Sequence, residues 1–191
     1  SRLRVHVTAV PKETMAKFPQ FDIGVINEGE VTLVELIKAL EKNIDLHTVE
    51  GIIFRDDGDL IVTSPRAFNK DLDALPLPAW DLLPDLPRFY STPAYSLDRS
   101  PSSSIITTRG CGMQCTFCFQ GAFGRVIRMH SVDYILRMIK YLYHTYGIRN
   151  IRILDDNFLL KRDRIYEFCQ KLIAEKLNLT FSCLSRVDTI N

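Results

Sequence analysis

The hydrophobic and polar residues in the first part of the chain predict alternating strands and helices. Residues 3–10, LRVHVTAV, alternate apolar and polar side chains and predict a strand, and the apolar run FDIGVI at residues 21–26 predicts a buried strand. Residues 29–43 repeat apolar side chains at the 3.6-residue period of a helix. The apolar positions that define this predicted helix are Val31, Leu33, Val34, Leu36, Ile37 and Leu40.

A predicted hairpin and a proline-rich segment follow this helix. Within residues 49–64, two apolar runs flank Asp57-Gly58, a dipeptide typical of hairpin turns. Residues 71–104 hold six prolines, which neither a helix nor a central strand accommodates. The same segment carries Trp80 and other large apolar residues that a disordered linker would lack. We therefore expect a first domain at residues 1–70, followed by an extended segment pinned to the domains on both sides.

Residues 105–191 predict a second α/β region. Ser131 is a plausible helix N-cap and Gly147 a helix stop, with Ile135, Ile139 and Leu142 on one face between them. The apolar face of the second helix carries Ile165, Phe168, Cys169, Leu172 and Ile173. The predicted elements are strands at 104–110, 148–157 and 179–186 and helices at 132–146 and 162–177.

Strands that alternate with helices at this spacing predict a parallel sheet. Ligands of such sheets bind beyond the carboxyl ends of the strands. A cysteine-rich loop follows the first strand, Asp155-Asp156-Asn157 ends the second, and Arg186 ends the third. These three segments are therefore predicted to lie on one rim.

Composition narrows the class of protein. The 191 residues are 46% hydrophobic and 25% charged, with a net charge of +1, so neither nucleic acid nor a membrane surface is an expected partner. No apolar run approaches the roughly 18 residues of a membrane span. The five cysteines are odd in number and clustered, which favours metal ligands in a reducing cytoplasm over a secreted disulfide framework.

Three of these cysteines, Cys111, Cys115 and Cys118, have the spacing C-x₃-C-x₂-C. On a helix the outer two would lie about 10 Å apart along the axis, and the neighbouring glycines disfavour a helix. A loop would allow the three sulfurs to converge. Zinc would require a fourth ligand, for which His130, Cys169 and Cys183 are the candidates, although both cysteines fit core positions. An iron–sulfur cube tolerates three thiolates when a non-protein ligand completes one iron.

The cysteine spacing, with Phe117 just before the last cysteine, resembles the radical S-adenosylmethionine (radical SAM) enzymes. Further phrases resemble the branch of this superfamily that is associated with cobalamin-binding domains. They lie at residues 21–40, 50–66, 71–84, 128–142, 151–169 and 183–190. The resemblance implies an α/β fold: the tail of a Rossmann-like, cobalamin-binding type domain at 1–70, the connecting segment at 71–104, and the first half of a parallel (βα)6 partial TIM barrel at 105–191.

The resemblance also implies the cofactors and their ligands. Cys111, Cys115 and Cys118 would hold a [4Fe–4S] cluster whose fourth iron binds SAM, and an electron from the cluster would cleave SAM to a hydrogen-abstracting 5′-deoxyadenosyl radical. Phe117 would lie near the adenine, or pack under the loop. Asp155, Asp156 and Asn157 stand where the family has a turn that binds the SAM amino group, or form a solvated turn. Arg186 would face the same pocket.

The partners and the reaction are likewise implied rather than derived. A small-molecule substrate and a reductant such as flavodoxin or ferredoxin are expected, with cobalamin an option in the full-length protein for methylation or ring formation. The cobalt-binding histidine motif is absent, and His6 is not assigned to that role. We expect an internal fragment that does not turn over alone and self-associates through exposed sheet edges. The alternative is a non-catalytic module that holds zinc or an electron-transfer iron–sulfur cluster.

Overall fold

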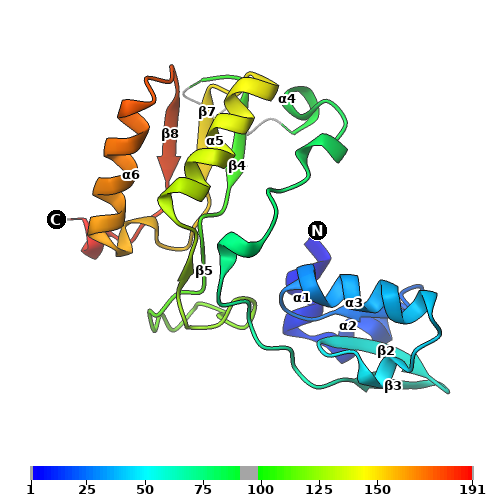
Figure 1. Cartoon of the computed structure of the whole chain (residues 1–191). Coiled ribbons are helices and arrows are strands. Elements are labelled where there is room, and N and C mark those ends of the chain that lie inside the picture. Colours follow the sequence, from blue (N-terminus) through cyan, green and yellow to red (C-terminus); the bar gives the residue numbers. More distant parts are fainter. Residues whose placement is uncertain (1, 91–98, 191) are drawn as a thin grey trace. The chain divides into compact units, whose positions relative to one another are not determined.

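The computed structural model describes residues 2–90 and 99–190, which fall into two compact units (Figure 1). The first unit comprises residues 1–70 and 112–126, and the second comprises 71–111 and 127–191. The connection between residues 111 and 112 therefore passes from one unit into the other, within the cysteine-rich loop.

The first unit contains an antiparallel sheet in the order β1-β2-β3. Its strands are β1 (Ile23–Val25), β2 (Ile52–Asp56) and β3 (Asp59–Val62). The predicted hairpin is confirmed: Asp57 and Gly58 connect β2 to β3 with φ angles of 45° and 92°, as a type I′ turn requires. No strand pair described in this unit is parallel, so the sheet itself does not display a Rossmann-like arrangement.

The predicted strand at residues 3–10 is wrong. The chain forms helix α1 (Arg2–Ala9), and Pro11 then begins a second helix, α2 (Pro11–Lys17). Val7 is buried against Met15 and Ile53, and Gly24 of β1 has no side chain to hold this helix away from the sheet. Tertiary packing therefore outweighs the alternating pattern and the β-branched side chains.

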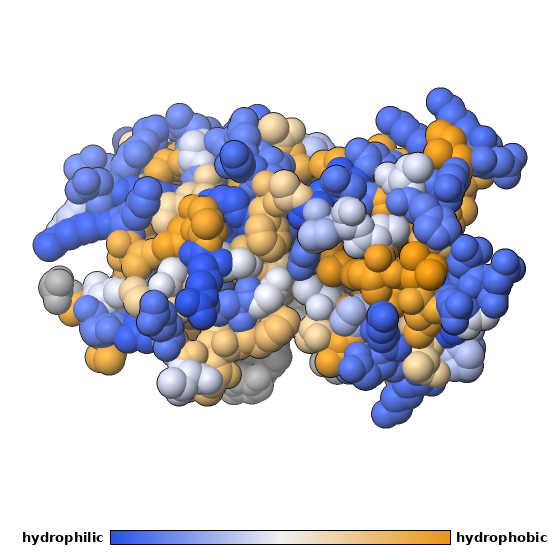
Figure 2. Space-filling model, turned by 90° about the horizontal axis from the view of Figure 1, so that it is seen from below, coloured by the Kyte–Doolittle hydropathy of each residue, from blue (hydrophilic) through white to orange (hydrophobic). Residues whose placement is uncertain are grey.

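The predicted helix at residues 29–43 is confirmed as α3 (Gly29–Glu41), but most of its apolar residues are not buried. Thr32, Leu36 and Ala39 form its buried face, because small side chains allow a close approach to the sheet. The other five predicted apolar positions are 45–52% exposed: Val31, Leu33, Val34, Ile37 and Leu40. Figure 2 shows one face of the molecule, on which hydrophobic side chains are exposed among hydrophilic ones.

The second unit contains the predicted parallel sheet, in the order β4-β7-β8. Its strands are β4 (Ser102–Ile105), β7 (Asn150–Ile153) and β8 (Thr180–Cys183). Helices α5 (Val132–Tyr146) and α6 (Arg162–Ala174) connect consecutive strands and contact each other (Figure 1). The alternating strand–helix order predicted for this region is confirmed.

Helix α5 begins and ends where the sequence predicts. The Ser131 hydroxyl accepts a hydrogen bond from the Tyr134 amide at 3.1 Å, and Gly147 ends the helix with a φ of 66°. Ile135, Ile139 and Leu142 are fully buried.

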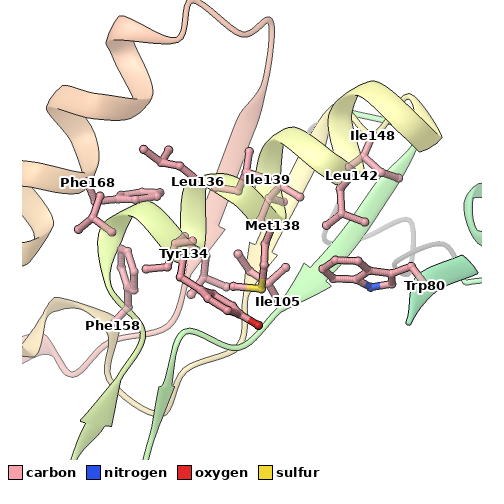
Figure 3. Close-up of a cluster of buried hydrophobic side chains, with 14 of the residues drawn as sticks. Trp80, Ile105, Tyr134, Leu136, Met138, Ile139, Leu142, Ile148, Phe158 and Phe168 are labelled. Atoms are coloured by element: carbon pink, nitrogen blue, oxygen red, sulfur yellow. The ribbon is translucent and has the colours of Figure 1, made fainter. Parts of the chain in front are cut away.

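The proline-rich segment contributes to the core of the second unit. It contains two short 3₁₀ turns (Leu72–Ala74 and Trp80–Leu82) and helix α4 (Leu86–Phe89). Trp80 and Leu86 are buried in the same hydrophobic cluster as α5, and Figure 3 shows the indole beside the side chains of this helix. Residues 91–98 of the segment lie outside the described residues. None of the described helices is long and apolar enough to cross a membrane.

The α6 face is predicted correctly except at one position. Phe168 is buried, and Ile165, Cys169 and Leu172 pack against the core, whereas Ile173 is 76% exposed.

Ile139 and Ile173 therefore form a matched pair of helical isoleucines in opposite environments. We expect Ile139→Ala to lower the free energy of unfolding of this unit by about 2–5 kcal/mol, because it leaves a cavity. Ile173→Ala should change it by about 0.5 kcal/mol or less.

Urea unfolding, monitored by the near-ultraviolet circular dichroism of the buried Trp80, measures the change in the free energy of unfolding in both variants. Equal losses in the two variants would contradict the packing described for α5.

Candidate functional site

The three segments predicted to share a rim leave the sheet at the same edge. Ile105, Ile153 and Cys183 are the last residues of their strands and lie directly opposite one another in the parallel register. The cysteine-rich loop, the Asp155–Asn157 turn and Arg186 all follow these residues. The three segments therefore begin at one edge of the sheet, as predicted.

The cysteine-rich loop is carried on a short two-stranded stem. Strand β5 (Thr108–Arg109) pairs antiparallel with β6 (Arg128–Met129), outside the parallel sheet. The single strand predicted at residues 104–110 is therefore wrong. It is interrupted after Ile105, because the amides of Thr107 and Thr108 donate to the Asp155 carboxylate.

The cysteines lie in irregular structure, as predicted. Gly110 has a φ of 82°, a conformation that favours glycine, immediately before Cys111. The Cys118 amide donates to the Cys115 carbonyl at 3.1 Å, which forms a turn. None of the three forms a disulfide; Cys111 and Cys115 are partly buried and Cys118 is exposed. Cys111 belongs to the second unit and the other two to the first. Across residues 2–90 and 99–190, no three His, Cys, Asp or Glu side chains are gathered as a metal site.

Internal contacts hold the distal part of the loop. The Gln120 side chain donates to the Met113 carbonyl, and Gly124, with a φ of 71°, lies against the ring of Phe68. Phe117 takes no part in this packing and is 91% exposed. The alternative of packing under the loop is therefore not what the structure shows.

The candidates for a fourth metal ligand all have structural partners. Cys169 and Cys183 pack against the hydrophobic core, which confirms the prediction that they are core residues. Burial, followed by the nearby Asp155, raises the pKa of the Cys183 thiol. The His130 ring stacks on Tyr134 with centroids 4.0 Å apart, and its Nδ1 lies 3.0 Å from a carboxylate oxygen of Asp73.

The Asp155–Asn157 turn presents its three side chains differently. Asp155 is 1% exposed and accepts hydrogen bonds from Thr107 and Thr108, whereas Asp156 is exposed. Asn157 is 5% exposed, and its Oδ1 accepts hydrogen bonds from the hydroxyls of Ser185 and Thr189. Of the two carboxylates, only that of Asp155 is buried.

The amide nitrogen of Asn157 is a buried donor for which the described residues provide no acceptor. An unsatisfied buried donor costs about 1–3 kcal/mol, so a ligand atom that accepts from it would recover this free energy. Because hydroxyls both donate and accept, rotation of the amide would instead present Oδ1 to a ligand donor such as an ammonium group. Asn157 therefore keeps one amide group for which the described residues offer no partner.

Arg186 forms an ion pair on the same side of the sheet. Its guanidinium donates to both carboxylate oxygens of Asp188, at 2.9 and 2.6 Å. Hydrogen bonding to Arg186 lowers the pKa of Asp188. The pair is partly exposed, so a carboxylate ligand would compete with Asp188 for the guanidinium.

The sequence pattern did not predict that a group of polar residues surrounds the stem. The members of this group are Asp73, Thr107, Thr108, His130 and Arg164. Arg164 donates to the Thr107 hydroxyl and carbonyl and to the His130 carbonyl. No spacing distinguishes Arg164 from Arg162, because both fit the first turn of the same helix. The adjacent Thr107 and Thr108, directly after an apolar strand, were the sequence signal that could have indicated this polar group.

The comparisons with known proteins match part of the second unit to a known family. The second unit is an α/β structure with a parallel sheet, and residues 105–189 match the model of the Radical SAM superfamily. These residues are therefore similar to the radical SAM superfamily.

Similar proteins extend the match over nearly the whole chain. An uncharacterised methyltransferase of Pyrococcus horikoshii is 34% identical over 187 residues, which are 97% of this chain and 39% of that protein. An anaerobic magnesium-protoporphyrin IX monomethyl ester cyclase of Synechocystis is 33% identical over 179 residues, which are 93% of this chain and 34% of that protein. The chain thus spans little more than a third of these relatives.

A solved structure shares the fold. It is the cobalamin-dependent S-adenosylmethionine radical enzyme OxsB with aqua-cobalamin and S-adenosylmethionine bound. The TM-score is 0.77 at 24% identity, over 96% of this chain and 25% of that one.

The buried His130 predicts a pH dependence of stability. Burial lowers its pKa below the usual 6.5, an effect that Asp73 opposes and that Arg109 and Arg164 reinforce. The unfolded chain therefore binds a proton at a higher pH than the folded chain does. The contribution to stability is complete above about pH 6.5 and is lost as the pH falls towards the lowered pKa. Desolvation opposes ionisation of Asp73, but hydrogen bonds from Ser131 and His130 outweigh it and lower its pKa below 3.8, outside this window.

We expect the free energy of unfolding to fall more steeply between pH 7 and pH 5 in the wild-type chain than in His130→Gln, which keeps a polar side chain but does not titrate. Urea titrations at three pH values measure the two slopes. A variant slope equal to or steeper than that of the wild type would show that His130 is not held neutral by burial.

Proposed function

We propose that this chain is part of a radical SAM enzyme in which Cys111, Cys115 and Cys118 hold a [4Fe–4S] cluster. The observation that carries the proposal is a loop with three cysteines, none of them in a disulfide, that follows the carboxyl end of a strand in a parallel sheet, within residues that match the superfamily. The donor set fits such a cluster, because three thiolates leave one iron for a non-protein ligand. His130, Cys169 and Cys183 already have structural partners, which disfavours a four-ligand zinc site.

The residues of the rim would bind and orient SAM. When bound, the cluster supplies the electron that cleaves SAM and so generates a radical that abstracts hydrogen from a substrate. Asn157 offers a buried amide to the methionyl group of SAM, with the exposed Asp156 beside it as a carboxylate for the amino group. Arg186 provides a planar fork for the SAM carboxylate if it leaves Asp188. Asp155 supports this site indirectly, because protein donors already occupy both of its oxygens.

The wider reaction is proposed from the relatives. Their names are those of a methyltransferase, a ring-forming cyclase and a cobalamin-dependent radical enzyme, so methylation or ring formation on a small molecule is the proposed reaction class. We assign residues 1–70 to the C-terminal part of a cobalamin-binding type domain, residues 71–104 to a connecting segment, and residues 105–191 to the first half of a (βα)6 barrel. A reductant such as flavodoxin or ferredoxin and a reducing cytoplasm complete the proposal.

Cluster binding is tested by iron content after anaerobic reconstitution of the 191-residue chain. We expect about four irons per chain in the wild type, and a loss of most of this iron in Cys115→Ala, because two thiolates hold the cluster poorly. Cys183→Ala is the matched control and should retain the iron. The paramagnetic resonance signal of the reduced cluster should change when SAM is added.

Full iron in Cys115→Ala, or loss of iron in Cys183→Ala, would overturn the ligand assignment. Colourless protein with a single zinc would select the non-catalytic alternative.

SAM binding is tested at Phe117, whose exposed ring is free to stack on the adenine. Phe117→Ala should weaken SAM binding by about 1–3 kcal/mol and leave the iron content unchanged, since stacking on a base has this magnitude. Phe119→Ala, two residues away in the same loop, is the control. Isothermal titration of the reconstituted protein measures both affinities. If the two variants bind SAM equally well, Phe117 does not contact the cofactor.

A further inference from the structure

A buried polar network surrounds the base of the stem that carries the cysteine-rich loop. Thr107 is fully buried, and each of its polar groups has a partner. Its amide donates to Asp155 Oδ1 at 2.6 Å, and its hydroxyl donates to Asp155 Oδ2. The Thr108 amide donates to the same Oδ1 at 3.0 Å. Asp155 thus binds the chain at the point where it leaves β4 and enters β5.

Arg164 also contacts Thr107 and connects the two ends of the stem. Its Nη2 donates to the Thr107 carbonyl at 3.1 Å and to the Thr107 hydroxyl at 3.0 Å, and its Nε donates to the His130 carbonyl at 3.3 Å. The His130 amide in turn donates to the Thr107 carbonyl at 3.0 Å. Residues 107 and 130 stand just before β5 and just after β6, so Arg164 contacts both ends of the stem.

The cost of this network indicates a role other than stability. The buried carboxylate of Asp155 and the partly buried guanidinium of Arg164 lose hydration, and apolar side chains of similar size often give equal or greater stability. Burial lowers the pKa of Arg164, an effect that the nearby Asp155 opposes. Of the bonds that Asp155 and Arg164 make here, nearly all go to one segment, residues 107–108. A fully satisfied network of this kind fixes geometry more tightly than apolar packing does.

We propose that Asp155 and Arg164 are positioning residues that fix the β5–β6 stem and thereby set where the cysteine-rich loop leaves the sheet. The stem holds residues 109 and 128 side by side, so the 18 residues between them begin and end at a fixed place. The role of this network in cluster binding rests on the proposed function, whereas the fixing of the stem does not.

Hydrogen exchange of the metal-free, 191-residue chain tests the fixing of the stem. Asp155→Ala removes the acceptor of two backbone amides, so Thr107, Thr108 and the stem should exchange about tenfold faster or more. Asp155→Asn should restore protection, because its amide oxygen accepts from both backbone amides. Asp163→Ala, an exposed aspartate on α6, is the matched control and should leave the stem unchanged.

A second pair of variants tests Arg164 without removal of its charge. Arg164→Lys retains the cation but loses the fork that reaches both Thr107 and His130, so exchange should rise at the stem. Arg162→Lys, on the exposed side of the same helix, is its control. Unchanged exchange at the stem in Asp155→Ala would overturn the proposal. An equal rise throughout β4, β7 and β8 would also overturn it, because the residue would then serve the core and not the stem.

Iron release from reconstituted protein to a chelator tests the link to the cluster. Asp155→Ala should release iron several-fold faster than the wild type, with Asp155→Asn close to the wild type. If all three proteins release iron at equal rates although Asp155→Ala loosens the stem, the network does not contribute to retention of the cluster. If the wild type itself binds no iron, the proposed function fails, and hydrogen exchange still decides whether Asp155 and Arg164 fix the stem.

Discussion

The arrangement of the rim depends on the Asp155 carboxylate, which accepts the amides of Thr107 and Thr108 at the carboxyl end of β4. Without a side chain acceptor, these amides would either extend the ladder with β7 or remain buried and unsatisfied. The carboxylate ends β4 at Ile105 and redirects the chain into the stem. The turn after β7 therefore organises the loop after β4, although 48 residues separate the two segments in sequence.

Capping and turn residues predicted the elements whose ends depend on residues adjacent in sequence. Helix α5 begins after Ser131, whose hydroxyl caps it, and ends at Gly147, which adopts a positive φ. Asp57 and Gly58 likewise adopt the positive φ angles that the turn between β2 and β3 requires. The parallel sheet and its shared rim followed from the order of the elements. Residues 3–10 were predicted wrongly, because the contact of Val7 with Met15 and Ile53 is not local.

The site was predicted in its location more fully than in its contacts. The sequence placed the cysteine-rich loop, the Asp155–Asn157 turn and Arg186 on one rim. It could not distinguish the buried Asp155 from the exposed Asp156, since burial depends on the donors of β4–β5 rather than on the turn. Similarly, the partner of Arg186 is Asp188, only two residues away, an interaction that the strand pattern does not reveal.

The central claim is that three cysteines hold a cluster to which SAM binds directly. Electron–nuclear double resonance of the reduced, reconstituted chain with SAM labelled with ¹⁵N at the methionyl amine tests this claim. The account predicts a ¹⁵N coupling to the cluster signal that is absent with unlabelled SAM. A cluster signal with no ¹⁵N coupling at saturating SAM, or no cluster signal at all, would contradict it.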